Sequence, residues 1–148
     1  MKFKIFLNLD TKIKVKCRNG FFENENLLEE YISQNPDRIT DEQIQILQAF
    51  KKKIKGKFII LKCLTHHAIL LNIDNNQFYT VKALGEPFTN FFDYLPVLVE
   101  AAIIPFKGKI VYDGFMFQQS LIGPGIKRNL LEDYKEAKRE KKIITAIV

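Results

Sequence analysis

Apolar and polar residues alternate through the first part of the chain. Residues 3–9 place an apolar side chain at every second position, and residues 12–17 repeat that pattern. A period of two is that of a β-strand with one buried face, so we expect two strands here, joined by a turn at residues 10–11. Residues 18–20, with the sequence Arg-Asn-Gly, predict a second tight turn because Asn-Gly tolerates a positive φ.

Helical spacing replaces the alternation after the second turn. Four apolar residues recur three and four positions apart and predict one helix: Leu27, Leu28, Tyr31 and Ile32. Asn24 is its expected N-cap, and Pro36 lies just beyond its end. Thr40 and Gln43 have the spacing of a capping box and begin a second helix, which we expect to end at Gly56.

The middle of the chain predicts a meander of three strands, at residues 57–64, 67–73 and 77–83, with a turn at residues 74–76. Apolar residues in these strands are continuous rather than alternating, which indicates that both faces are covered. The aromatic segment that follows, residues 86–96, predicts a short helical turn.

Strand and helix patterns follow one another in the last third of the chain. Residues 97–104 fit either a helix or a strand, and we favour a strand. Residues 107–119 predict another strand, bent at Gly114. A helix is expected over residues 126–141, followed by an apolar terminal strand at 143–148.

Together the elements predict an α+β fold: one mainly antiparallel sheet or small open barrel with about three packed helices. The 148 residues are an ordinary length for one domain, so we expect a single domain over residues 1–148. Hydrophobic residues make up 47% and charged residues 27% of the chain, as in soluble globular proteins. No apolar run reaches the ~18 residues of a membrane span, and no secretory signal pattern is present. We therefore expect a cytoplasmic protein with no membrane partner.

The chain is basic, with a formal net charge of +6 at pH 7. This charge suits a polyanionic partner, and we expect either nucleic acid, RNA or DNA, or an acidic protein surface. The alternative is compositional: Lys, Ile and Asn are abundant and have AT-rich codons, so a low-GC genome would give a basic protein without such a role.

Two cations stand where a helix start favours negative charge. Lys127 and Arg128 fall in the first turn of the predicted C-terminal helix, where unpaired N–H groups and the helix dipole are positive. Flanking glycines would let a ligand approach that backbone, and a bound phosphate would make the charges favourable. We therefore predict a nucleic-acid-binding site at Lys127, Arg128, Lys135, Arg139, Lys142, Gly123 and Gly125. The alternative is a plain turn before a solvated surface helix.

The same helix has an apolar face, which we expect to be buried and which comprises Ile126, Leu130, Tyr134 and Ala137. The basic residues from Arg128 onward share another face, which is interrupted by Glu132.

Residues 63–67, Cys-Leu-Thr-His-His, are the one cluster of catalytic or metal-ligating residue types. His66 and His67 point to opposite faces of a strand, and Cys63 lies too far from His67 along a straight strand to share a metal ion. We expect structural histidines and no metal. Because the sequence has neither a P-loop nor a dinucleotide-binding motif, we also expect no cofactor. The enzyme alternative is a hydrolase or nuclease that uses His66 or His67 with Asp113.

Two further groups each have two interpretations. Glu100 lies in an apolar segment, and is either at an exposed strand edge or buried beside a cation, with Lys107 or Lys109 as the expected partner. Four aromatic residues would stack on bases if exposed, although core filling is the default for Phe88, Phe91, Phe92 and Tyr94.

A longer stretch near the C-terminus has a pattern that extends over several elements. Residues 105–114 have the sequence PFKGKIVYDG, residues 123–128 have GPGIKR, residues 134–138 have YKEAK and residues 143–145 have IIT. On these residues the segment Ile104–Thr145 resembles the C-terminal segment of an uncharacterised bacterial protein family. No activity is attached to that family, so the resemblance implies only a common module.

Three functions follow from these patterns. We favour a non-enzymatic nucleic-acid-binding module that contacts phosphate through the C-terminal helix. The second is a small regulator or inhibitor that binds a protein partner which itself handles nucleic acid. The third is the hydrolase or nuclease with His66 or His67 and Asp113.

Overall fold

The computed structural model describes residues 11–83, 88–90 and 92–147. The chain divides into two compact units, Met1–Lys51 and Lys52–Val148, and each is described by itself. The strand predicted at residues 3–9 lies outside the described residues. That the whole chain is one domain stays a prediction.

The first unit is helical. Its elements are α2 (Thr11–Glu23), α3 (Glu25–Gln34), α4 (Asp41–Ala49) and the first part of a 3₁₀ turn, η1 (Phe50–Lys52). The strand predicted at residues 12–17 and the turn predicted at 18–20 are therefore wrong, because both belong to α2. A segment with alternating apolar residues forms a β-strand only if a neighbouring strand can pair with it. The Lys and Arg residues of this segment favour a helix. Among the described residues of this unit only Leu28 is buried.

Side chains at the ends of these helices confirm part of the sequence reading. Asn24 is the N-cap residue of α3, although its side chain makes no capping hydrogen bond. The capping box of α4 is formed: the Gln43 N–H donates to Thr40 Oγ1 over 3.2 Å, and the Thr40 N–H donates to Gln43 Oε1 over 2.9 Å.

Gly56 does not cap α4, contrary to expectation, since it lies in the first strand of the second unit. A Cβ atom at this position would stand 3.2 Å from Asp74 Oδ2. Glycine there lets the turn that carries Asp74 pack closely against the strand.

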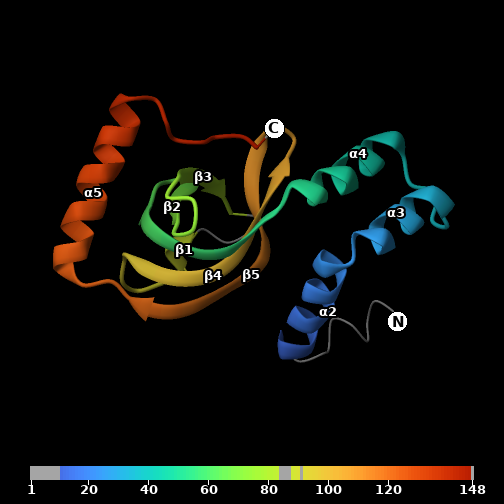
Figure 1. Cartoon of the computed structure of the whole chain (residues 1–148), viewed down its shortest axis with the longest axis horizontal. Helices are drawn as coiled ribbons and strands as arrows, with labels where there is room; N and C mark the ends of the chain where they lie inside the picture. Colours follow the sequence, from blue (N-terminus) through green and yellow to red (C-terminus); the bar gives the residue numbers. More distant parts are fainter. Residues whose placement is uncertain (1–10, 84–87, 91, 148) are drawn as a thin grey trace. The chain divides into compact units, whose positions relative to one another are not determined.

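The second unit is a closed five-stranded barrel in the order β1-β2-β3-β5-β4 (Figure 1). Its strands are β1 (Ile54–Cys63), β2 (His67–Asn72), β3 (Phe78–Lys82), β4 (Val97–Phe106) and β5 (Lys109–Leu121). Antiparallel pairing joins neighbours everywhere except between β3 and β5, which run parallel. The chain is thus α+β with a small, mainly antiparallel barrel, as the sequence predicts, and the barrel is closed rather than open.

The bend predicted at Gly114 coincides with an irregularity in the β4–β5 ladder. Ala101 pairs with Met116 and Ile103 pairs with Tyr112, so the β5 side contains two extra residues between these pairs. Such an insertion bends the strand and increases its twist, which a closed barrel of five strands requires.

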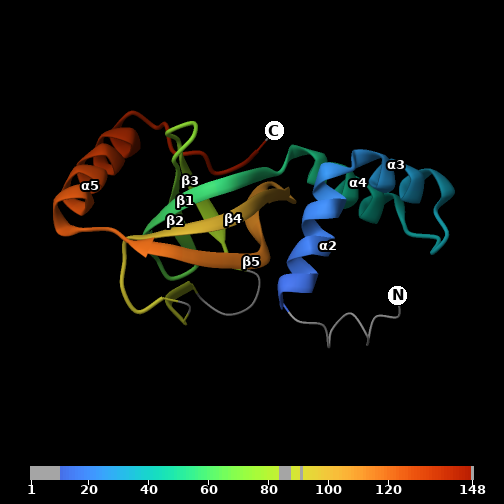
Figure 2. The same ribbon diagram turned by 60° about the horizontal axis from the view of Figure 1, so that its bottom comes forward.

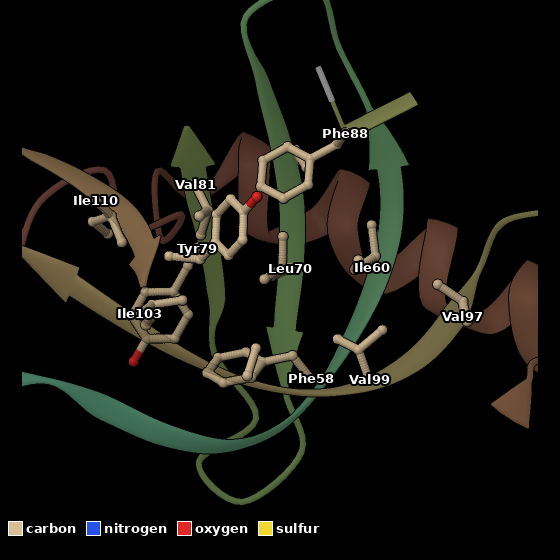
Figure 3. Close-up of a cluster of buried hydrophobic side chains, with 13 residues drawn as sticks. Phe58, Ile60, Leu70, Tyr79, Val81, Phe88, Val97, Val99, Ile103 and Ile110 are labelled. Atoms are coloured by element: carbon tan, nitrogen blue, oxygen red, sulfur yellow. The ribbon is translucent and has the colours of Figure 1, made fainter. Parts of the chain in front are cut away.

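Alternate residues of the strands fill the barrel interior. Figure 3 shows side chains of the barrel strands pointing into this common core, including Phe58, Ile60, Leu70, Tyr79, Val81, Val97, Val99, Ile103 and Ile110. The 3₁₀ turn η2 (Phe88–Asn90), within the segment where a helical turn is predicted, adds Phe88. Its side chain is only 3% exposed, and its ring centroid lies 5.3 Å from that of Tyr112.

The other face of β1, β2 and β3 is covered by α5 (Pro124–Arg139), which lies along the barrel in Figures 1 and 2. Leu130 and Tyr134 of α5 are buried there, as the sequence predicts. The Tyr134 ring meets the Phe78 ring edge to face at 5.7 Å. Ile126 is 57% exposed, so its predicted burial is wrong.

The chain after α5 returns to the barrel. Ile144 forms a parallel bridge with Tyr79, in which the Thr80 N–H donates to Ile144 O and the Ile144 N–H donates to Phe78 O, each over 2.9 Å. The strand predicted for residues 143–148 is therefore reduced, within the described residues, to this one bridge.

Candidate anion-binding site

The predicted site at the start of α5 is exposed, and the fold does not require the glycines that flank it. Gly123 is the N-cap residue with φ −69°, and Pro124 begins the helix. No atom lies within 4 Å of a Cβ placed at Gly123 or Gly125, so the fold does not require glycine at either position. Lys127 and Arg128 are exposed and are the fourth and fifth residues of α5, whose first turn contains no acidic residue. Their role in binding stays a prediction.

The basic face of α5 is interleaved with carboxylates. Lys135 and Arg139 are exposed, and Glu132 and Glu136 alternate with them along the helix. Lys142 lies beyond the helix end, and its ammonium group forms a 2.7 Å ion pair with Glu140. This hydrogen bond and the opposite charge raise the pKa of Lys142 and lower the pKa of Glu140. Lys142 therefore already has an anionic partner.

The Cys-His segment folds into a tight hairpin connection rather than a straight strand. The Leu64 N–H donates to His67 O over 2.7 Å, and Cys63 pairs with Ala68 across the two strands. Burial raises the pKa of the Cys63 thiol, the opposite of what a reactive thiolate needs. In the described part of the chain, no group of three His, Cys, Asp or Glu side chains is placed to hold a metal ion.

The structure forms no catalytic pair from the predicted residues. Across the residues that it describes, neither His66 nor His67 makes a hydrogen bond or ion pair with Asp113. Asp113 Oδ1 instead accepts from the Phe115 N–H over 3.2 Å, inside the irregular part of β5.

Glu100 and the aromatic segment take mostly structural positions. Glu100 is half-buried on β4, and the residue opposite it on β1 is Lys57 rather than Lys107 or Lys109. Phe88 fills the core and Phe92 packs against it, whereas Tyr94 is 72% exposed. Phe91 lies outside the described residues.

A cluster of basic side chains that the sequence analysis did not single out lies at one end of the barrel. His67 at the start of β2 pairs with Lys82 at the end of β3. Lys82 in turn pairs with Val111 near the start of β5, and Lys109 lies two residues earlier on the same face of that strand. We call the group of His66, His67, Lys82 and Lys109 the rim cluster.

The directions of two pKa shifts agree with the proximity of these side chains. The pKa of Lys82 is lowered, mainly by the hydrogen-bonding contact of its side chain with Lys109 and secondly by the charge of Lys109. Burial lowers the pKa of His67, and the charges of Lys82 and His66 lower it further. None of the four side chains makes an ion pair with a carboxylate in the described residues. The two lysines of the rim cluster thus concentrate like charge at one point, and a bound anion would stabilise it.

An aromatic residue lies beside the rim cluster. Phe106 ends β4 directly opposite Lys109, so both side chains stand on the same face of the hairpin. The Phe106 side chain is 37% exposed, and the Lys107 ammonium lies 5.7 Å from its ring centroid. Lys107 and Gly108 form the connecting turn with φ values of 48° and 78°.

The rim cluster and the start of α5 are separate places. Lys109 begins β5, whereas Gly123 follows Leu121 at the opposite end of that strand (Figure 1). The fold therefore offers two distinct candidate sites for an anion, and only the rim cluster draws basic side chains from several elements.

No protein-family model, curated protein or solved structure matches this chain. The resemblance of Ile104–Thr145 to an uncharacterised bacterial family stays a sequence-based prediction. Among the helices of the described ranges, none is long and apolar enough to cross a membrane.

Proposed function

We propose that the chain is a non-enzymatic nucleic-acid-binding module whose rim cluster contacts backbone phosphate. The observation that carries the proposal is the convergence of His66, His67, Lys82 and Lys109 from three separate segments, with no carboxylate of the described residues in an ion pair with them. A phosphate held between the two lysines replaces repulsion with charge-assisted hydrogen bonds. The net charge of +6 adds long-range attraction for the same class of ligand.

The architecture supports the proposal by analogy. The spatial order β4-β1-β2-β3 is a Greek key, which β5 closes into a five-stranded barrel. Five-stranded Greek-key barrels of the OB-fold type bind oligonucleotides on strands 2 and 3 and on the loops that join strands 1 to 2 and 4 to 5. The rim cluster lies at these strands and loops. This is an analogy of fold and not of sequence.

Helix α5 limits where a nucleic-acid strand could bind on the barrel. In the barrel, α5 packs over Ile69, Leu71 and Phe78, which lie on the outer face of β2 and β3. His67 and Lys82 belong to the same face at its other end, beyond this apolar cluster. Binding at the rim therefore requires no displacement of α5.

The test is fluorescence polarisation with labelled single- and double-stranded RNA and DNA over a range of salt concentrations. Two variants of equal charge change are compared: Lys82→Glu with Lys109→Glu at the rim, and Lys127→Glu with Arg128→Glu at the α5 start. We expect the native chain to bind with an affinity that falls as salt rises. The rim variant should bind weakly, with a salt slope smaller by about 2, because two phosphate contacts are removed.

Opposite results are readily distinguished. Loss of binding in the α5 variant alone would return the site to Lys127 and Arg128. Failure of the native chain to bind any of the four nucleic acids at low salt would refute the proposed function.

A further inference from the structure

We infer that the rim cluster is a site for a phosphomonoester, the doubly charged phosphate group found at the end of a nucleic-acid strand. This inference rests on the proposed function and names the part of the ligand that the site recognises. It follows from the compactness of the cluster, from its supply of donors and from the position of Phe106.

The first argument is the spatial distribution of charge. Internal phosphates of a strand carry one negative charge each and are spread along the backbone, so proteins that follow them line a groove with cations. In this barrel two cations instead meet at one point, where Lys82 lies against Lys109, and the His67 imidazole lies opposite Lys82. A single group with a charge of about −1.5 to −2 at pH 7 complements such a point better than a singly charged diester.

The second argument is the number of hydrogen bonds. A phosphomonoester presents three terminal oxygens, each of which accepts more than one hydrogen bond. Each lysine ammonium of the rim cluster offers three N–H donors, and each neutral imidazole offers one. Lys82, Lys109 and His67 can therefore saturate a terminal phosphate, whereas an internal phosphodiester has only two non-bridging oxygens to accept from them.

The third argument is the neighbouring aromatic side chain. Phe106 lies directly across the β4–β5 hairpin from Lys109 and exposes 37% of its surface. The terminal base of a strand has a neighbouring base on one side only, so its other face can stack on such a ring. With the phosphate on Lys109 and the base on Phe106, both parts of a terminal nucleotide contact one end of the barrel.

The experiment compares oligonucleotides that differ only at their ends. Labelled strands of one sequence carry a 5′-phosphate, a 3′-phosphate or hydroxyl groups at both ends, and their affinities are measured at constant salt. We expect one phosphorylated end to bind at least about tenfold more tightly than the hydroxyl strand, as one or two added charge-assisted hydrogen bonds would give. The Lys82→Gln/Lys109→Gln variant should lose that advantage, while Lys127→Gln/Arg128→Gln should keep it.

A second measurement separates this inference from the proposed function. Inorganic phosphate and a nucleoside 5′-monophosphate are titrated while NMR follows the imidazole signals of His66 and His67. Equal binding of all three strands would overturn the phosphomonoester site and leave nucleic-acid binding intact. Shifts with the monophosphate but no binding of any strand would keep the site for a free phosphomonoester and refute the proposed function. If no strand binds and no signal shifts, both are wrong.

Discussion

Lys82 on β3 and Lys109 on β5 lie in contact where these two strands run parallel, although both side chains are cationic. The contact with Lys109 lowers the pKa of Lys82. A fold that holds two ammonium groups together stores repulsion at this point, and that repulsion is relieved when an anion binds or when one charge is removed.

Removal of the Lys109 charge should raise the pKa of Lys82. In Lys109→Gln the charge of residue 109 is removed and its hydrogen-bonding contact with Lys82 is weakened. The Lys82 pKa should therefore return toward its ordinary value of 10.5. NMR titration of the lysine side-chain signals measures this directly. Lys55→Gln, an exposed substitution near the start of β1, is the control and should leave Lys82 unchanged. An unaltered Lys82 pKa in Lys109→Gln would show that the two groups are not in contact in solution.

Nucleic-acid affinity should rise as the pH falls below neutrality. In the free protein, burial and the charges of Lys82 and His66 hold the pKa of His67 below 6.5. A bound phosphate favours the protonated imidazole and raises the pKa of His67. At a pH between the pKa of the free protein and that of the complex, binding is therefore accompanied by uptake of a proton. A strand with hydroxyl ends is the right probe, since its phosphodiesters stay charged over this range.

The matched variant for this pH dependence is His67→Gln, which keeps a polar side chain but does not titrate. It should flatten the increase in affinity below about pH 6.5. If the native affinity is the same at pH 7.5 and pH 5.5, His67 does not face the bound anion.

The sequence predicted the barrel strands from local patterns, although residues 97–104 fitted a helix as well as a strand. Continuous apolar runs at 57–64, 67–73 and 97–104 correspond to β1, β2 and β4. Segment 12–17 has an equally clear alternation, yet it is helical. The five strands close on one another and so leave no free edge for another strand. The local pattern of apolar and polar residues does not show whether a neighbouring strand is present to pair with the segment.

The candidate site was missed because its members are far apart in the sequence. The turn at residues 74–76 already fixes the hairpin register that pairs His67 with Lys82, so this half of the site was within reach of sequence reasoning. The approach of Lys109 depends on the parallel contact between Lys82 and Val111, which no local pattern encodes. Lys127 and Arg128 were predicted from a local signal, two cations near a helix start, and a local signal does not show whether side chains from other elements converge there.

Charge reversal at the start of α5 should stabilise the free protein. Lys127 and Arg128 are the fourth and fifth residues of α5, near a helix start without acidic residues, where the helix dipole disfavours positive charge. Lys127→Glu with Arg128→Glu should raise the free energy of unfolding by about 0.5–1 kcal/mol at low salt. Chemical denaturation at low and high salt measures the gain, which screening should diminish. A loss of stability at low salt would mean that an anionic group of the protein already neutralises these cations.

Attachment of α5 to the barrel should depend strongly on Tyr134. Its ring is 5% exposed, meets the Phe78 ring at 5.7 Å and has the Lys62 ammonium 4.8 Å from its centroid. Tyr134→Ala removes this packing and leaves a cavity between helix and sheet, so the free energy of unfolding should fall by about 3–5 kcal/mol. Denaturant unfolding gives this value, and hydrogen exchange should show faster exchange across α5 than across the barrel strands.

Tyr134→Phe distinguishes packing from hydrogen bonding. No partner for the Tyr134 hydroxyl is found among the described residues, and burial of that hydroxyl raises its pKa. The phenylalanine ring keeps the contact with Phe78 and the cation–π interaction with Lys62, so this variant should unfold within about 1 kcal/mol of the native protein. A large loss in Tyr134→Phe would mean that the hydroxyl, rather than the ring, fastens α5 to the barrel.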